Sequence, residues 1–405
     1  VELDPAVPRS CGGCAVAGAV GAAGVTGRRV RLGGRVVLAR RQRGGRRGGQ
    51  RGAVRRPRAG PPAGAGRVPE RQGGRRVGVL VRLPLVGGAL DGTLEQVVED
   101  MVVQGAKIIF TTSEDFQTDT DAVAAKYPDI QFVMISGDHA KTGVAPANVT
   151  NVMGRMEYAK AIAGCAAALR TETKSIAYLG PLINSETRRL TAATYLGARD
   201  CYEMYRGGDP DELKFTVNWI GFWFNIPGVT LDPTQVANDL FNQGADVVLS
   251  GIDTTEAIVV AGQRADKGEQ VWAIPYDYVG ACDLKPEICL GTPYFNWGPT
   301  YVKYLTAFKE GTLKQGFEWS APDWNDINNR DTSAVGFVMG DALSEEDRAN
   351  LNDYIAKLAS GEVKLFSGPL NLQDGTELVG EGVVATDDQV WNLPQLLEGM
   401  TGASE

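Results

Sequence analysis

The sequence predicts an α/β protein with two lobes, each a largely parallel sheet flanked by helices. Short apolar strands alternate with helical segments from about residue 91 onward, and small or polar residues follow each strand. One helix–strand unit occurs twice, as DMVVQGAKIIFTTS and as DLFNQGADVVLSGI. Two similar lobes that face each other would form a clamshell.

The first lobe is expected over residues 77–155, with residues 294–335 returning to it. Apolar residues at helical spacing, from Leu94 to Val102, predict a helix that ends at Gln104-Gly105. The next elements are predicted as the strand Lys107–Phe110, a helix through Ala122–Tyr127 and the strand Gln131–Ile135.

The second lobe is expected over residues 156–293, with residues 336–400 packing on it. Because parallel strands end at one edge of a sheet, where open α/β sheets bind ligands, the segments after its strands form the candidate site. The helices are predicted at Glu157–Leu169, Glu186–Tyr205, Gln235–Asn242 and Glu256–Arg264, and the strands at Ser175–Leu179, Leu213–Ile220, Asp246–Leu249 and Val271–Pro275.

The densest aromatic cluster lies in NWIGFWFNIPGVTLDP, residues 218–233. Trp219 falls within the expected strand, whereas Trp223 and Phe224 come after it and are free to face a cleft. Flat rings at the end of a strand offer a stacking surface, although most aromatic clusters are part of a core. The stretch closes with Asp-Pro, which is typical of a helix N-cap followed by proline at the first helical position.

The net charge of −8 is unevenly distributed along the sequence. Residues 1–90 contain 19 Arg, no Lys and three acidic residues, giving +16, so the remainder carries −24. Three interpretations of the atypical segment 1–76 are open: a basic arm that binds nucleic acid or anionic lipid, a disordered tail, and a gene translated out of frame. We favour the last, because basic arms usually mix Lys with Arg, and exclude the segment from the fold analysis.

Several classes of protein are excluded by what the sequence lacks. No run approaches 18 apolar residues, so no transmembrane helix is predicted. There is neither a GxxxxGK[ST] loop nor a GxGxxG after a strand, and His139 is the only histidine. No cofactor and no metal are therefore expected.

The cysteines favour an exported protein. Cys282 and Cys289 flank a six-residue loop, CDLKPEIC, which suits a small disulfide. Cys165 and Cys201 lie in predicted helices and are either buried thiols or a second bridge.

Several segments occur in the order of a known family: GAKIIFTTS with KYPDIQFV, MEYAKAIAGCAAAL, NQGADVVLSGI, IPYD and PYFNWGPTYVKYLTAFKEG. Over about residues 91–400 the chain resembles the BMP (basic membrane protein, PnrA-like) substrate-binding proteins of ABC transporters. The resemblance implies the type I periplasmic-binding-protein fold, with two α/β lobes, crossover strands as a hinge and a purine nucleoside or nucleobase in the cleft. Residues 1–90 do not match the family, whose opening strand and loop supply one wall of the site.

The resemblance implies ligand-binding positions at the strand ends of both lobes. An aromatic residue of the second lobe stacks on the base, and an acid accepts from the ribose hydroxyls. The matching residues here are Thr111, Thr112 and Ser113 in the first lobe, Trp223 and Phe224 for stacking, Gly251, Ile252 and Asp253 in the next loop, Asp277 as the acid, and Asn296 and Trp297 at the hinge.

The chemistry of these residues fits the same ligand. A carboxylate accepts charge-assisted bonds from vicinal hydroxyls, and asparagine offers a donor and an acceptor to a purine edge. Structural alternatives stay open for each of them. They are a turn cap for Asp277, a turn residue for Asn296, an ordinary loop for Thr111–Ser113 and a helix N-cap for Asp253.

The sequence thus predicts an extracytoplasmic solute-binding protein of an ABC importer, not an enzyme, that binds a purine nucleoside or nucleobase by hinge closure. Its expected partners are that small molecule and the transporter permease. No nucleic-acid partner is expected, because the acidic body repels phosphates. Two alternatives remain: a nutrient-sensing binding protein without a transport role, and a nucleoside-processing enzyme that uses aspartates.

The expected location is the periplasm or the cell surface. Contact with the membrane is expected only through a lipid anchor on the native protein. That anchor is absent from this sequence, since neither Cys11 nor Cys14 follows the apolar segment that a lipobox requires.

Overall fold

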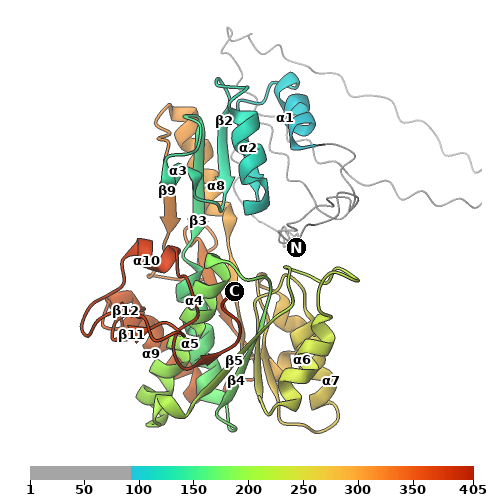
Figure 1. Cartoon of the computed structure of the whole chain (residues 1–405), viewed down its shortest axis with the longest axis vertical. Helices are drawn as coiled ribbons and strands as arrows, with labels where there is room; N and C mark the ends of the chain where they lie inside the picture. Colours follow the sequence, from blue (N-terminus) through green and yellow to red (C-terminus); the bar gives the residue numbers. More distant parts are fainter. Residues whose placement is uncertain (1–92) are drawn as a thin grey trace, which may run out of the picture.

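The computed structural model describes residues 93–405. The predictions for segment 1–76, and for Cys11 and Cys14, lie outside the described residues. Two separate parallel sheets organise the described chain, one above the other in Figure 1. We call the body around the four-stranded sheet lobe 1 and the body around the five-stranded sheet lobe 2.

Lobe 1 contains a parallel sheet in the order β1-β2-β3-β9, covered on both faces. Side chains alternate between the faces: Ile109 packs with α1 and α2, whereas Ile108 and Phe110 pack with α8. The strands are β1 (Ile108–Thr112), β2 (Gln131–Ile135), β3 (Val149–Gly154) and β9 (Phe317–Ser320). The helices are α1 (Leu94–Val103), the 3₁₀ turn η1 (Glu114–Phe116), α2 (Gln117–Ala124), α3 (His139–Thr142) and α8 (Trp297–Glu310).

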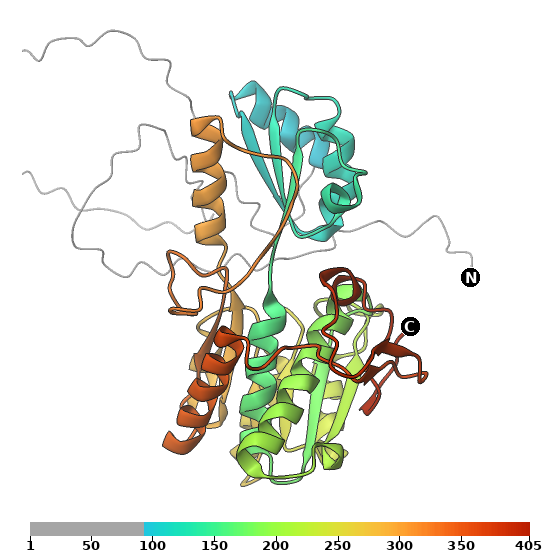
Figure 2. The same ribbon diagram turned by 90° about the vertical axis from the view of Figure 1, so that its left-hand side faces the viewer.

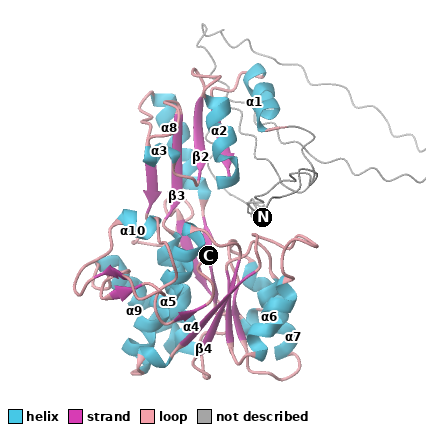
Figure 3. Ribbon diagram, viewed as in Figure 1, coloured by secondary structure: helices cyan, strands magenta, loops and turns pink. Residues whose placement is uncertain are grey.

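Lobe 2 contains a parallel sheet in the order β13-β5-β4-β6-β7. Helices α4 and α5 lie on one side of it and α6 and α7 on the other (Figure 3). The strands are β4 (Ser175–Gly180), β5 (Lys214–Trp219), β6 (Val247–Ser250), β7 (Trp272–Ile274) and β13 (Met400–Thr401). The helices are α4 (Met156–Arg170), α5 (Ser185–Arg206), η2 (Pro210–Glu212), α6 (Pro233–Asn242), α7 (Glu256–Ala265), η3 (Ala281–Leu284) and η4 (Pro286–Ile288).

Within residues 93–405, the chain passes between the lobes three times, from β3 into α4, from β8 into α8 and from β9 to β10 (Figure 2). The antiparallel pair of β8 (Gly291–Phe295) and β10 (Val335–Met339) joins the second and third passages. The last elements are α9 (Glu345–Ser360), β11 (Leu370–Asn371), β12 (Glu377–Val379) and α10 (Asp387–Trp391). The predicted fold class, an α/β protein with parallel sheets flanked by helices, is confirmed.

Helices α4 and α5 pack unusually close together. A Cβ on Gly164 would lie 1.8 Å from the carbonyl oxygen of Thr194, and one on Gly197 would lie 2.0 Å from that of Ala161. A disulfide joins Cys165 to Cys201 across the same contact, with their Cα atoms 5.1 Å apart. Of the two alternatives for these cysteines, the structure therefore has the bridge, and it fixes the two helices relative to each other.

Helix α10 contacts both lobes. The indole Nε1 of Trp391 donates a hydrogen bond to Asp138 of lobe 1 over 3.1 Å, and Lys141 of α3 forms an ion pair with Asp388. On the lobe 2 side, the guanidinium of Arg189 lies 4.1 Å from the centre of a Trp391 ring. The short helix therefore bridges the two lobes.

The predicted start of α6 is confirmed. The side chain of Asp232 accepts hydrogen bonds from the backbone N–H groups of Thr234 (2.8 Å) and Gln235 (3.1 Å), and Pro233 is the first helical residue. Within residues 93–405, no helix is both long and apolar enough to cross a membrane.

Candidate functional site

The strands of lobe 2 end together at an edge that faces lobe 1. Parallel pairing aligns the ends of β4, β5, β6 and β7. Helices α4 and α5 begin at this same edge, because α5 follows the end of β4 and α4 follows β3 of lobe 1. We call these strand ends, with the first turns of α4 and α5, the interlobe edge.

A buried lysine lies at the interlobe edge. Lys160 of α4 is 1% exposed, and its Nζ donates a 2.8 Å hydrogen bond to the carbonyl oxygen of Ser250 at the end of β6. The same Nζ lies 3.6 Å from the centre of the Tyr276 ring and 5.0 Å from that of Tyr178. Burial lowers the pKa of Lys160, and the negative charge of Asp277 opposes this shift.

Next to it lies a buried ion pair. The Nε of Arg189 donates to Glu157 over 2.6 Å, and the two side chains are 2% and 6% exposed. Burial raises the pKa of Glu157, whereas the charge of Arg189 lowers it. The pair ties the first turn of α4 to the second turn of α5.

Three carboxyl groups gather around these cations. Burial raises the pKa of Asp277 to about 6, against the opposing charge of Lys160. Burial raises the pKa of Asp253 to about 9, helped by the negative charges of Asp277, Glu186 and, from lobe 1, Asp115. Burial likewise raises the pKa of Glu186 to about 7. In all three carboxyl groups, burial is therefore the largest cause of the raised pKa.

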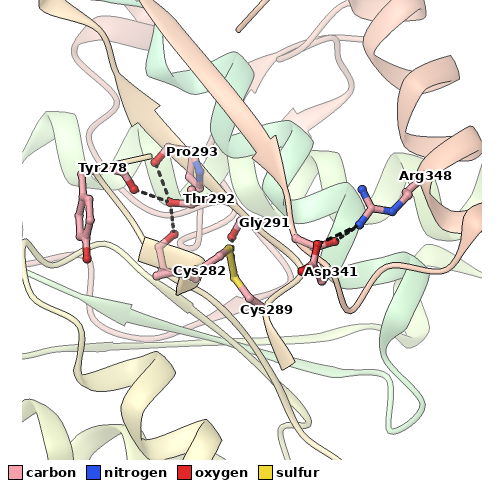
Figure 4. Close-up of a disulfide and its surroundings, with 10 residues drawn as sticks. Tyr278, Cys282, Cys289, Gly291, Thr292, Pro293, Asp341 and Arg348 are labelled. Carbon is pink, nitrogen blue, oxygen red and sulfur yellow. Dashed lines mark hydrogen bonds and ion pairs between the residues drawn. A yellow bond between two sulfur atoms is a disulfide. The ribbon is translucent and has the colours of Figure 1, made fainter. Parts of the chain in front are cut away.

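The backbone at Asp277 is strained and is held from several sides. Its φ is +85°, which is uncommon for a residue other than glycine, and its N–H donates to the carbonyl oxygen of Pro293 over 3.1 Å. The hydroxyl of Thr292 lies 3.3 Å from the carbonyl oxygen of Pro275 and donates to it. A disulfide between Cys282 and Cys289 closes the loop that follows (Figure 4).

The aromatic loop after β5 is tied to the Asp253 loop. The carbonyl oxygen of Trp223 accepts a 2.8 Å hydrogen bond from the N–H of Asp253. Phe222 and Phe224 make an edge-to-face pair with ring centres 5.0 Å apart, and Trp223 and Phe224 are both half-buried. Trp219 instead lies at the end of β5 and donates its indole N–H to Ala403 over 2.7 Å.

In lobe 1 the three predicted residues have different environments. Thr111 is buried within β1, and its hydroxyl donates to the sulfur of Met134 and accepts from Thr120, so it is engaged inside the lobe. Thr112 is half-buried at the strand end. The hydroxyl of Ser113 accepts from the N–H of Asp115 (3.3 Å) and caps the 3₁₀ turn η1.

The residues predicted at the hinge are engaged with the protein. Both hydrogen bonds donated by the Asn296 amide go to backbone carbonyl oxygens, of Arg330 (3.0 Å) and Ser333 (2.8 Å). Its Nδ2 is therefore not free to donate to a ligand, and only Oδ1 remains. Trp297 stacks on Phe295, with ring centres 4.8 Å apart.

The loop after β6 excludes one structural alternative for Asp253. Asp253 is not the N-cap of α7, because the helix begins at Glu256 and Thr255 occupies the cap position. Gly251 and Ile252 are buried. A Cβ on Gly251 would lie 2.6 Å from the Tyr178 ring, so this position requires glycine.

Lys160, Glu186 and the Glu157–Arg189 pair were not predicted from the sequence. One signal was available: Glu157 and Lys160 are charged and three residues apart in an otherwise small and apolar segment, MEYAKAIAGCAAAL. Charged residues in such a helix are rarely buried without a partner. No comparable signal marks Glu186, which lies in an ordinary polar first turn.

Other features of the described chain do not compete with this edge. A cavity of about 350 Å³ lies beside α3 and carries no charged lining residue; it is lined by Ala140, Gly143, Ala145, Ala147, Gln315 and Gly316. Within residues 93–405, no group of three or more His, Cys, Asp or Glu side chains is arranged to hold a metal ion.

Comparison with known proteins identifies the family. The family model of PnrA-like ABC transporter substrate-binding proteins matches residues 81–365. A purine-binding protein of Brucella abortus (strain 2308) is 26% identical over 307 residues, which are 76% of this chain and 79% of the relative. A protein of Haloferax volcanii, named as a candidate glucose-binding protein of an ABC transporter, is also 26% identical, over 76% of this chain and 68% of the relative.

Solved structures agree on the fold. A solute-binding protein of an ABC transporter system from Aeropyrum pernix K1 superposes with a TM-score of 0.52 at 14% identity, over 75% of this chain and 87% of that one. A transcriptional activator of the comK gene from Bacillus halodurans superposes with a TM-score of 0.51 at 19% identity, over 67% and 86% of the two chains.

The family match starts ten residues before the expected position 91 and ends before 400. The chain belongs to the PnrA-like substrate-binding proteins of ABC transporters.

Proposed function

We propose that this substrate-binding protein captures a purine nucleoside or nucleobase between its two lobes and presents it to the permease of an ABC importer. The observation that carries the proposal is the hydrogen bond between Trp223 and Asp253. It brings the aromatic loop after β5 to the edge where Asp253 and Asp277 interact. A flat ring and a carboxylate at one edge suit a ligand that has a planar base and hydroxyl groups.

The residues have separate roles in this proposal. Trp223 and Phe224 stack on the base, and Asp277 accepts from the sugar hydroxyls. Thr112 and Ser113 supply hydroxyl groups from lobe 1. Thr111 and Asn296 position these elements without donating to the ligand, since their donor groups already have partners, and Trp297 contributes a ring stacked on Phe295.

Closure of the lobes completes the site. The moving bodies are the two expected lobes, residues 77–155 with 294–335 and residues 156–293 with 336–400, connected by the three passages. A ligand that contacts both lobes binds the closed form better and shifts the equilibrium towards it. The permease then recognises the closed form.

We place this activity outside the cytoplasm, in the periplasm or at the cell surface, with attachment through a lipid anchor. Two disulfides support the oxidising compartment, since such bonds persist mainly in exported proteins. Members of this family work outside the cytoplasm, which supports the same location.

A sugar is the second candidate ligand. One relative is named for glucose, and carboxyl groups that accept from hydroxyls suit a sugar as well as a nucleoside. The two candidates differ in their need for the aromatic loop, because a sugar has no planar base that could stack on Trp223 and Phe224.

Titration calorimetry of the full chain tests the proposal. The ligands are adenosine, guanosine, inosine, adenine and glucose, with chromatography of the recovered ligand to detect any turnover. Micromolar or tighter binding of a purine, with the ligand recovered intact, is the expected result. Binding of glucose alone would replace the purine by the sugar, and a cleaved nucleoside would indicate an enzyme.

Replacing the stacking residue tests the ligand class separately. Trp223→Ala should weaken purine binding by about 1–3 kcal/mol. Val229→Ala is the control, because Val229 is 75% exposed in the same loop and should leave affinity unchanged. If Trp223→Ala binds like the wild type, Trp223 does not stack on the ligand.

A further inference from the structure

We propose that α10 is a latch that opposes closure of the two lobes. The helix is fixed to lobe 2, and its residues Asp388 and Trp391 hold lobe 1. Closure of the lobes breaks these two contacts, so the latch lowers the affinity for the ligand. The effect on affinity rests on the proposed function, whereas the effect on the arrangement of the lobes does not.

The first step is that α10 belongs to lobe 2. The segment after it places Leu393, Leu396 and Leu397 in the core of that lobe, where each side chain is at most 1% exposed. The guanidinium of Arg188 in α5 also donates to the carbonyl oxygen of Leu393 over 2.8 Å. Because these leucines are buried directly behind the helix, α10 moves with lobe 2.

The second step is that α10 holds lobe 1. The indole N–H of Trp391 donates to Asp138 over 3.1 Å, and its ring lies edge-on to Phe317 of β9, with ring centres 4.8 Å apart. Asp388 forms an ion pair with Lys141. In the part of the chain that the structure describes, the bonds to Asp138 and Lys141 are the only side-chain hydrogen bonds or ion pairs that join the lobes outside the passages. Among these residues, the polar link between the lobes is therefore made by α10 and not across the interlobe edge.

The third step concerns the side on which this link lies. In Figure 1, α10 lies to the left of the passage from β3 into α4, whereas α6 and α7, which follow the loops after β5 and β6, lie to the right. Lobe 1 turns about the passages, so a rotation towards those loops moves it away from α10. Closure therefore breaks the bonds to Asp138 and Lys141, and contacts with the ligand have to compensate for them.

One further contact of α10 is placed to survive the rotation. Asp387 forms an ion pair with Arg155, which lies in the first passage between β3 and α4. A residue in a passage lies near the axis of rotation, so this pair keeps its geometry in both arrangements. Asp387 and Asp388 are neighbours in the first turn of α10, 64% and 75% exposed. They are therefore a matched pair for experiment.

The binding test uses calorimetric titration of full-length variants with the tightest-binding nucleoside. Asp388→Lys places a like charge opposite Lys141 and should tighten binding about three- to tenfold, because it replaces a surface attraction by a repulsion and raises the closed population. The exchange of Lys141→Asp together with Asp388→Lys restores the ion pair and should return the affinity to that of the wild type. Asp387→Lys is the matched control and should leave the affinity unchanged.

The sign of the effect decides the binding test. An Asp388→Lys variant that binds more weakly than the wild type, or equally well, would overturn the inference. An exchange variant that keeps the altered affinity would also overturn it, because the effect would then not come from the ion pair. Equal changes in Asp387→Lys and Asp388→Lys would show a general effect of charge and contradict the latch.

A ligand-free measurement keeps the inference testable if no purine binds. By small-angle X-ray scattering, Asp388→Lys should have a smaller radius of gyration than the wild type, because more of the protein is closed, and Asp387→Lys should match the wild type. Equal radii in all three proteins would overturn the inference. Absence of ligand binding alone would overturn only the proposed function.

A measurement on the wild type decides the case in which Asp388→Lys fails to fold. The tryptophans are labelled with ¹⁵N, and the signal that disappears in Trp391→Phe belongs to the indole that binds Asp138. Saturating ligand should shift this signal and speed the exchange of its N–H with solvent, because closure breaks the bond. An indole signal that keeps its position and its exchange rate on binding would overturn the inference.

Discussion

The repeated helix–strand unit has the same backbone conformation at its helix end in both lobes, but the acidic residues that follow its strand differ in exposure. In lobe 1, α1 ends at Gln104-Gly105, Gly105 has φ +92°, and Ala106 N–H donates to the carbonyl oxygen of Met101. In lobe 2, α6 ends at Gln243-Gly244 with φ +101° at the glycine, and Ala245 N–H donates to Leu240. Both are the same left-handed helix termination, so the internal repeat predicted from the sequence is structural.

The strands that follow differ in their neighbours. Among residues 93–405, β1 pairs with β2 alone, whereas β6 lies between β4 and β7. Beyond β1 the acidic residues Glu114 and Asp115 are exposed; beyond β6, Asp253 is half-buried among charged groups. The same helix–strand unit therefore leaves acidic residues exposed in lobe 1 and half-buried among charged groups in lobe 2. The elements packed around the end of each strand account for this difference.

The largest expected effect comes from breaking the buried ion pair of lobe 2. Arg189→Met should destabilise the protein by about 3–5 kcal/mol, because Glu157 would keep a buried charge without its partner. Lys303→Met is the matched change in lobe 1, where Lys303 is 62% exposed and pairs with Glu318. It should cost at most about 1 kcal/mol. Urea unfolding measures both, and equal losses would show that lobe 2 gains nothing from burial.

A second prediction uses the pH dependence of stability. The pKa of Asp253 is raised to about 9 in the folded protein, against about 3.9 in an unfolded chain. The folded state therefore holds a proton that the unfolded state releases, so this contribution is complete below about pH 4 and is lost as the pH rises to 9.

Asp253→Asn should therefore flatten the fall in stability with pH and stabilise the ligand-free protein at pH 9, where the wild-type carboxyl group loses the contribution of its raised pKa. Asp115→Asn, after the equivalent strand of lobe 1, should have a smaller effect because Asp115 is exposed. Thermal unfolding between pH 5 and 9 measures the slope. An unchanged slope in Asp253→Asn would place its pKa near the ordinary value.

The smallest expected effect concerns the hydroxyl groups of lobe 1. Thr112→Val should weaken ligand binding by about 0.5–1.5 kcal/mol, the contribution of one neutral hydrogen bond. Thr111→Val is the comparison, because the Thr111 hydroxyl bonds inside the lobe and its loss should affect stability rather than affinity. Calorimetry with urea unfolding separates the two, and an affinity loss in Thr111→Val would reverse their roles.

Features set by neighbouring residues could be predicted from the sequence. Asp232 and Pro233 start α6 through bonds to residues two and three positions away, and the periodicity of the apolar residues predicted the alternating elements. The shared Gln-Gly-Ala motif predicted that the two units are equivalent.

The environments of the site residues could not be predicted in this way. The bond from Lys160 to Ser250 spans 90 positions, and Asn296 binds residues 34 and 37 positions away. Strand β1 ends two residues later than expected, at Thr112 rather than Phe110, which places Thr111 inside the sheet. Side-chain partners at such separations depend on how the elements pack, and no local pattern encodes them.

The central claim is that lobe 2 recognises the hydroxyl groups of its ligand through Asp277. The most direct test is calorimetric titration of Asp277→Asn with adenosine and with adenine. The account predicts that adenosine binding weakens by about 1.5–3 kcal/mol, the contribution of hydrogen bonds to a charged group, while adenine binding stays close to that of the wild type. Equal losses for the nucleoside and the base would contradict it.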